Sequence, residues 1–155
     1  IRFKTPMLFA IGFVAMFIIG GLSGVTHAIV PHDRQQTDTY YIVAHFHYVL
    51  FGGSLFGIFG AFYYWWPKVF GYLLNEKLGK LHFWLMLIGF NMTFFPMHQL
   101  GLQGHMRRIY DPNEYQFLQH LQPLNTMISI AAFVSTQIPA SSAVTTRRFI
   151  RRSFP

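Results

Sequence analysis

The sequence lacks cysteine altogether and contains only five acidic residues in 155. Without cysteine, the chain can form neither a disulfide framework nor a cysteine-ligated metal cluster. Charged residues make up 11% of the chain, whereas 52% of it is hydrophobic and 19% aromatic. Because the few charges stand outside long apolar runs, this composition indicates an integral membrane protein and argues against a soluble domain.

Four stretches without Asp, Glu, Lys or Arg define the predicted architecture, and they cover residues 7–25, 40–66, 81–100 and 124–144. Each has about the ~20 residues that an α-helix needs to cross a bilayer. We therefore expect an all-α membrane protein in which residues 1–155 form one domain with four transmembrane helices. Residues 1–6 show no signal-peptide pattern, so we expect the first helix to be retained.

A formal net charge of +7 is compatible with binding to nucleic acid, but the positions of the basic residues favour a role in topology. Four alternating spans place most of them on one side of the membrane: Arg2, Lys4, Lys68, Lys77, Lys80, Arg147, Arg148, Arg151 and Arg152. The other side receives Arg34, Arg107 and Arg108. By the positive-inside rule, both termini face the matrix or the cytoplasm. We expect a lipid bilayer around the chain and no nucleic-acid partner.

The second apolar stretch contains His45-Phe46-His47. Side chains at positions i and i+2 of an α-helix point about 200° apart, so two imidazoles placed there cannot share one metal. They can each hold a different one. A β-strand would direct both rings to one face and suit a single metal, but the length of this uncharged stretch argues against a strand.

Two interpretations of the histidine pair follow from the residues. Histidine within a membrane is costly and marks a candidate functional site, and neutral imidazole is a common axial ligand of haem iron. Imidazoles can also form hydrogen bonds between packed transmembrane helices without any further chemistry. The spacing by itself leaves both interpretations open.

The sequence around the pair resembles subunit I of cytochrome c oxidase, in the haem–copper oxidase family. Residues 38–50, DTYYIVAHFHYVL, are similar to the signature of the helix called X in that family. Similar segments follow in family order at residues 62–68, 71–75, 80–83 and 91–96, and end near residues 101–104 and Arg107-Arg108. The resemblance covers most of residues 5–115.

The resemblance implies roles for the histidines and for two arginines. His45 would ligate the iron of haem a3, where oxygen binds, and His47 the iron of haem a. Arg107 and Arg108 would contact the haem propionates, and guanidinium groups suit bidentate recognition of carboxylates. Just before them, the chain reads Gly104-His105-Met106 where the family usually has Gly-Met-Pro.

The resemblance also implies a magnesium ion in the loop before the second span, with Asp38 as a ligand. The family has a histidine directly before this aspartate, but here the position is Thr37. Mg²⁺ prefers oxygen ligands and retains several waters, so the carboxylate can still support a site. His32 is a weaker candidate that could replace the missing imidazole.

Family members are twelve-helix bundles, and this chain resembles the last four helices. Motifs for the second haem a ligand and for the three copper-ligating histidines are missing from it. We therefore interpret it as the C-terminal piece of a split subunit I, inactive alone. The expected partners are an N-terminal fragment that brings copper B, subunits II and III, and cytochrome c. The implied reaction transfers electrons from cytochrome c to oxygen and is coupled to proton pumping.

The expected location is the mitochondrial inner membrane, with the bacterial plasma membrane as the alternative. Two other functions stay open. A quinol oxidase subunit shares the His-x-His helix, although residues 48–50 are more similar to the cytochrome c branch. A membrane scaffold or transporter subunit without catalytic activity, in which the histidines only pack, is the third candidate.

Overall fold

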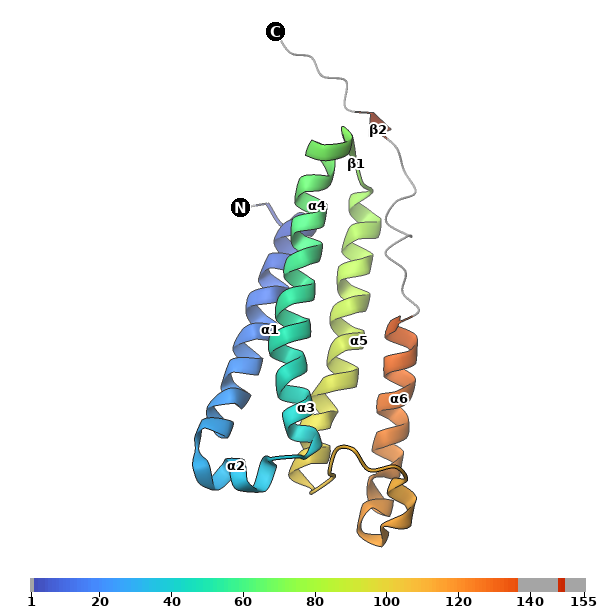
Figure 1. The fold of residues 1–155 in the computed structure, drawn as a ribbon. Coiled ribbons are helices and arrows are strands. Elements are labelled where there is room, and N and C mark those ends of the chain that lie inside the picture. The colour runs from blue at the N-terminus through green and yellow to red at the C-terminus, as the bar shows by residue number, and fades with distance from the viewer. Residues whose placement is uncertain (1, 137–147, 150–155) are drawn as a thin grey trace.

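The computed structural model describes residues 2–136 and 148–149. It consists of long helices that run alternately up and down beside one another (Figure 1). In chain order, the elements are α1 (Thr5–Ala28), α2 (Val30–Gln36), α3 (Tyr40–Phe46), the π-helical η1 (His47–Leu55), α4 (Phe56–Phe70), β1 (Tyr72–Leu73), α5 (Glu76–Leu102), the short 3₁₀ helices η2 (Pro112–Glu114) and η3 (Gln116–Leu121), α6 (Gln122–Thr136) and β2 (Arg148–Phe149). The two short strands pair antiparallel.

Within the described residues, three helical segments are long and apolar enough to cross a membrane: Thr5–Ala28, the continuous α3–η1–α4 segment Tyr40–Phe70, and Glu76–Leu102. This result confirms the prediction of an all-α membrane protein. The fourth expected span, residues 124–144, is described only as far as Thr136 in α6. Its remainder lies outside the described residues.

The loop between the second and third long helices is shorter than the gap between the two predicted apolar stretches. Pro67 lies just beyond the second predicted span (residues 40–66), but α4 continues through it to Phe70, and α5 begins at Glu76, before the third predicted span (residues 81–100). Asn75 caps α5 by accepting a hydrogen bond from the Lys77 amide at 3.0 Å. The charged residues that follow are therefore helical, because a cap sets where a helix begins whereas apolarity sets only where it enters lipid.

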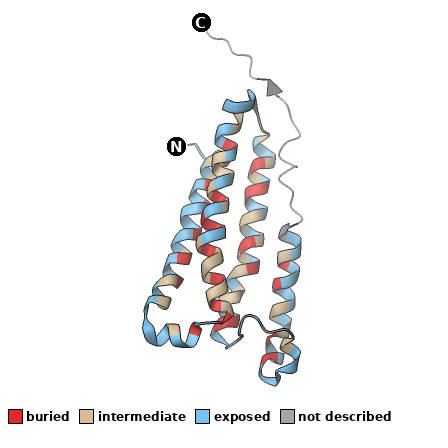
Figure 2. Cartoon of the chain, viewed as in Figure 1, coloured by how far each residue is buried: buried red, intermediate tan, exposed pale blue. Residues whose placement is uncertain are grey.

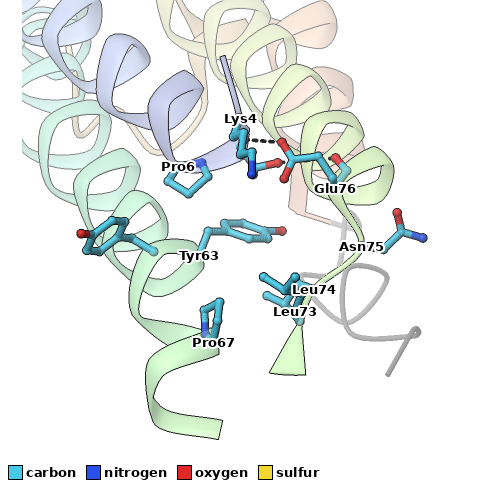
Figure 3. Close-up of a pocket in the computed structure, with 10 residues that line it drawn as sticks. Lys4, Pro6, Tyr63, Pro67, Leu73, Leu74, Asn75 and Glu76 are labelled. Atoms are coloured by element: carbon cyan, nitrogen blue, oxygen red, sulfur yellow. Dashed lines mark hydrogen bonds between the residues drawn. The ribbon is translucent and has the colours of Figure 1, made fainter. Parts of the chain in front are cut away.

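The same end of the bundle holds the beginning of α1. The amide nitrogen of Thr5 donates a hydrogen bond of 2.6 Å to Oε1 of Glu76, whereas Lys4 at the N-cap forms no side-chain cap. A carboxylate suits this place because the first helical amides lack partners and the helix dipole is positive there. Figure 3 shows Glu76 and Tyr63 around the resulting pocket of about 310 Å³.

Aromatic rings form the core between α1, α4 and α5. Phe9 and Phe56 are fully buried with ring centroids 5.8 Å apart, and Phe83 meets Phe9 edge-on at 5.2 Å. Figure 2 shows buried residues on the inward sides of the helices and exposed residues outside. Large apolar side chains such as Phe17 and Leu22 are exposed there, as expected of a surface that meets lipid or other membrane helices.

At the opposite end, the start of α3 packs backbone to backbone against the end of α5. A Cβ atom on Gly101 would lie 2.6 Å from Cα of Tyr41 and would also collide with its amide nitrogen. Only glycine allows this approach without a shift of the backbone. The contact fixes the segment before α3 beside the loop after α5.

We expect Gly101→Ala to destabilise the protein by about 1–3 kcal/mol, because the added methyl group overpacks a backbone contact. Gly21→Ala is the matched control, since no atom lies within 4 Å of a Cβ atom at that helical position. Thermal unfolding of the two purified variants in detergent measures the difference. Equal unfolding temperatures would contradict the role of Gly101.

Candidate functional site

The two histidines of the sequence motif lie where the second span changes its helical geometry. Thr39 begins α3 by accepting a hydrogen bond from the Tyr41 amide at 3.3 Å, and His45 lies in the last turn of that helix. From His47 to Leu55, the backbone forms a π-helix. The sequence predicted a plain α-helix here, because its apolar pattern does not distinguish the two periods. Such π-helical turns are frequent at functional sites.

The two imidazoles contact different neighbouring helices. Nδ1 of His45 lies 2.9 Å from the carbonyl oxygen of Gly20 in α1 and 3.0 Å from Oγ of Ser23. The His47 ring stacks on Phe94 of α5, with centroids 4.2 Å apart and planes 17° from parallel. The helix that carries both residues therefore lies between their rings.

The hydrogen bonds of the two rings determine which nitrogen is free. Nδ1 of His47 lies 2.8 Å from the carbonyl oxygen of Val43, just as Nδ1 of His45 faces that of Gly20. A carbonyl oxygen can only accept, so each Nδ1 carries the proton and each Nε2 keeps its lone pair. No described residue forms a hydrogen bond with either Nε2. Metal-bound histidines are oriented in this way by their second nitrogen, so both rings fit the role of axial haem ligand.

An open groove of about 370 Å³ lies beside His47. Its walls are almost entirely apolar and include Phe46, Phe51 and Ile58. Apolar walls with a few well-placed polar groups are typical of cofactor sites.

Two residues to which the sequence gave separate roles form an ion pair in the structure. Nη2 of Arg107 lies 2.8 Å from Oδ1 of Asp38, and Nε lies 3.0 Å from the same oxygen. The Arg107 amide also donates to the Asp38 carbonyl oxygen at 2.8 Å. Asp38, the expected magnesium ligand, thus pairs with Arg107, which was expected to contact a haem propionate. Arg108 follows with a positive φ of 66° and is exposed.

Magnesium and copper were expected near this chain, but the part of it that the structure describes contains no group of three or more His, Cys, Asp or Glu side chains arranged to hold a metal. His32 is an exposed residue of α2. The magnesium assignment therefore stays a prediction that rests on Asp38 and on further ligands from water or other chains.

Sequence reasoning gave no role to His105, which is 3% exposed and joins three helices. Its backbone accepts from the Tyr40 amide at 3.0 Å and donates to the carbonyl oxygen of Leu100 at 3.0 Å. Its Nε2 lies 2.9 Å from Nδ2 of Asn125 in α6, and its Nδ1 lies 3.0 Å from the Met106 carbonyl oxygen. The departure from the family's Gly-Met-Pro was the one signal that pointed to this residue.

Sequence reasoning also overlooked His27, which lies two positions beyond the first predicted span (residues 7–25). The structure places it in the last turn of α1, where its ring centroid lies 5.0 Å from that of His45. A third imidazole therefore lies beside the first candidate ligand.

The antiparallel bundle, with three helical segments long and apolar enough to cross a membrane, defines an integral membrane protein that carries two imidazoles with free Nε2 atoms on one segment. Comparison with known proteins gives the particular family. Residues 1–134 match the family described as cytochrome c and quinol oxidase polypeptide I, and the chain belongs to that family.

Several bacterial relatives are similar over most of the chain. Cytochrome c oxidase subunit 1 of Thermostichus vulcanus is 57% identical over 136 residues, which are 86% of this chain and 23% of the relative. A putative cytochrome c oxidase subunit 1-beta of Streptomyces coelicolor is 51% identical over 134 residues, with the same shares. Quinol oxidase subunit 1 of Bacillus spizizenii is 52% identical over 116 residues, or 74% of this chain and 18% of the relative. The chain thus spans less than a quarter of the length of these relatives.

We expect His105→Ala to destabilise the protein by about 1–3 kcal/mol, because the half-buried amide of Asn125 loses its partner and the substitution leaves a cavity at a buried position. His120→Ala is the control, since His120 is exposed in the same connection between α5 and α6. Thermal unfolding in detergent should show a lower midpoint for His105→Ala only. A midpoint equal to that of the control would show that the His105 contacts contribute nothing to the stability of the protein.

Proposed function

We propose that this chain is the C-terminal part of the catalytic subunit of cytochrome c oxidase, with His45 as the axial ligand of haem a3 and His47 as that of haem a. The observation that carries the proposal is the state of the two rings. Each donates through Nδ1 to a backbone carbonyl oxygen at 2.8–2.9 Å and keeps Nε2 free, and the rings contact different helices. Membership of the oxidase family supports the same assignment.

Haem supplies the one-electron chemistry by which an oxidase passes electrons to oxygen, and each oxygen molecule takes up four electrons and four protons to form two waters. The residues of this chain hold and tune that chemistry. The carbonyl oxygen of Gly20 accepts a hydrogen bond from Nδ1–H of His45, which orients the ring and makes its Nε2 more basic. The face of Phe94 restricts the His47 ring to one plane.

This chain would also fix the distance between the two iron ligands. His45 and His47 are separated only by Phe46, and the segment that carries them is helical without a break from Tyr40 to Phe70. The relative placement of the two ligand atoms is therefore fixed within one secondary-structure element. Transmembrane helices that pack around it cannot easily change that placement.

The arginines contribute charge at the end of the bundle where the second span begins. Arg107 and Arg108 would neutralise haem propionates, with Asp38 holding the Arg107 guanidinium in position. Because net charge near a haem sets its reduction potential, these three residues form a tuning group. A magnesium ion on Asp38 would belong to the same group.

The proposal requires partners, since the described residues offer two candidate iron ligands and no cluster for copper B. An N-terminal portion of subunit I would bring the other haem a ligand and the copper histidines, and subunits II and III and cytochrome c would complete the system. Of the two membranes considered, the mitochondrial inner membrane and the bacterial plasma membrane, the bacterial relatives favour the second. From the distribution of basic residues, we infer that the termini face the cytoplasm.

A quinol oxidase is the second candidate, because a quinol oxidase subunit 1 is among the similar proteins. The two functions differ only in the electron donor. Oxygen uptake by the purified complex with reduced cytochrome c, compared with uptake with a quinol, separates them. A non-catalytic scaffold would show neither uptake nor a haem spectrum.

We expect His45→Ala to remove the high-spin, oxygen-reactive haem from the assembled complex, and His47→Ala to disturb the low-spin haem. Each substitution deletes one iron ligand and leaves the other ring in place. Reduced-minus-oxidised and carbon monoxide difference spectra measure the two haems separately, with His120→Ala as a control that should retain both. Loss of both signals from either substitution, in complexes that still assemble, would contradict the assignment.

We expect Arg107→Gln and Arg108→Gln to lower haem midpoint potentials, because a positive neighbour favours the reduced state. Asp38→Asn should raise them, since it removes a negative charge from beside Arg107. A unit charge acting over roughly 10 Å at an effective dielectric near ~20 is worth about 2 kcal/mol, so shifts on the order of tens of millivolts are expected.

Redox titration of the assembled complexes measures these shifts. Arg34→Gln is the control, because Arg34 is an exposed arginine of α2 on the same side of the membrane. The double variant Arg107→Gln/Asp38→Asn should lie near the unaltered potential, since its two changes oppose each other. Arginine variants that titrate like the control would show that the pair lies away from the haems.

A further inference from the structure

His27 has polar atoms that the described part of the chain does not satisfy. Its side chain is 13% exposed, and both ring nitrogens are buried without a hydrogen-bond partner. Nearly all buried polar groups in native proteins have a partner, and an unpaired one costs about 1–3 kcal/mol. We expect a group from outside these residues to bind His27.

The neighbours of His27 are occupied or too distant. Oδ1 of Asp33 is 3.6 Å from its Nδ1, which is longer than a hydrogen bond, and that oxygen already accepts from Thr37 at 3.1 Å. The Tyr41 ring meets the imidazole edge-on at 5.3 Å, and its hydroxyl oxygen accepts a hydrogen bond from Thr26 at 3.2 Å. Neither contact supplies a partner for the ring nitrogens.

The position of His27 indicates what kind of group would bind its ring nitrogens. Its ring lies 5.0 Å from the His45 ring, and His45 presents its free Nε2 for ligation. His27 also belongs to the last turn of α1, at the end of the bundle where α3 begins and where the loop after α5 returns (Figure 1). Asp38 and Arg107 meet at that same end.

We propose that His27 donates a hydrogen bond to a carboxylate on the edge of the macrocycle that His45 ligates. This inference rests on the proposed function of His45. An imidazole N–H and a carboxylate form a charge-assisted hydrogen bond, which is stronger than one between neutral groups. α1 would thus hold the macrocycle indirectly through the ring of His45, oriented by Gly20, and directly at its edge through His27.

The test uses the assembled complex and three variants. His27→Leu removes both nitrogens at similar volume, His27→Gln keeps a donor, and His120→Leu replaces an exposed histidine as a control. Resonance Raman spectra of the high-spin haem report the propionate bending bands and the iron–histidine stretch separately. We expect His27→Leu to shift the propionate bands and to lower the midpoint potential, because the carboxylate loses a donor. His27→Gln should return both towards the unaltered values.

Two results would overturn the inference while leaving the proposed function intact. The first is an assembled His27→Leu complex in which the propionate bands and the midpoint potential are both unchanged, whatever the iron–histidine stretch does. The second needs no variant: an experimental density map of the unaltered complex in which both nitrogens bond only to Asp33 or to water. A carboxylate oxygen within hydrogen-bond distance of His27 would support it. Retention of the high-spin haem in His45→Ala would instead refute the proposed function itself.

Discussion

The hydrogen bond from Nδ1 of His45 to the carbonyl oxygen of Gly20 is the interaction on which the site depends. Within a bilayer no bulk water can satisfy an imidazole, so each ring nitrogen needs a partner from protein or cofactor. Gly24 leaves the space, because a Cβ atom there would lie 2.9 Å from Cε1 of His45. The bond joins the first two spans and also fixes which nitrogen is free, so helix packing and the orientation of the candidate ligand depend on one contact.

The other polar side chains in the core follow the same constraint. Tyr48 donates to Asn91 at 2.7 Å, and the Tyr63 hydroxyl lies 3.1 Å from Nδ1 of His82, so both pairs join the second span to α5. These two pairs thereby hold helices together. His27 departs from this pattern, which is why its nitrogens point to a partner outside the described chain.

The end of the bundle is organised by contacts between residues far apart in sequence. Asp38 and Arg107 are 69 positions apart, yet backbone and side-chain bonds both join them, and His105 connects the same loop to α6. An exposed ion pair contributes little stability by itself. The ion pair serves instead to position the two side chains. The backbone hydrogen bond between Arg107 and Asp38 holds the guanidinium next to the carboxylate, at the end of the bundle where the second span begins.

The sequence by itself determined the membrane class, the first three spans and the candidate ligands, because apolar length and the period of a helix are local properties that residues 40–66 and the His45–His47 spacing display directly. It left outside the predicted spans two residues that are helical: Glu76, which follows the Asn75 cap, and His27, in the last turn of α1. Only the tertiary structure decided that Asp38 meets Arg107, that His105 joins three helices and that Gly20 occupies Nδ1 of His45. These contacts depend on how helices approach one another, and no local pattern encodes the distance between residues that are brought together by packing.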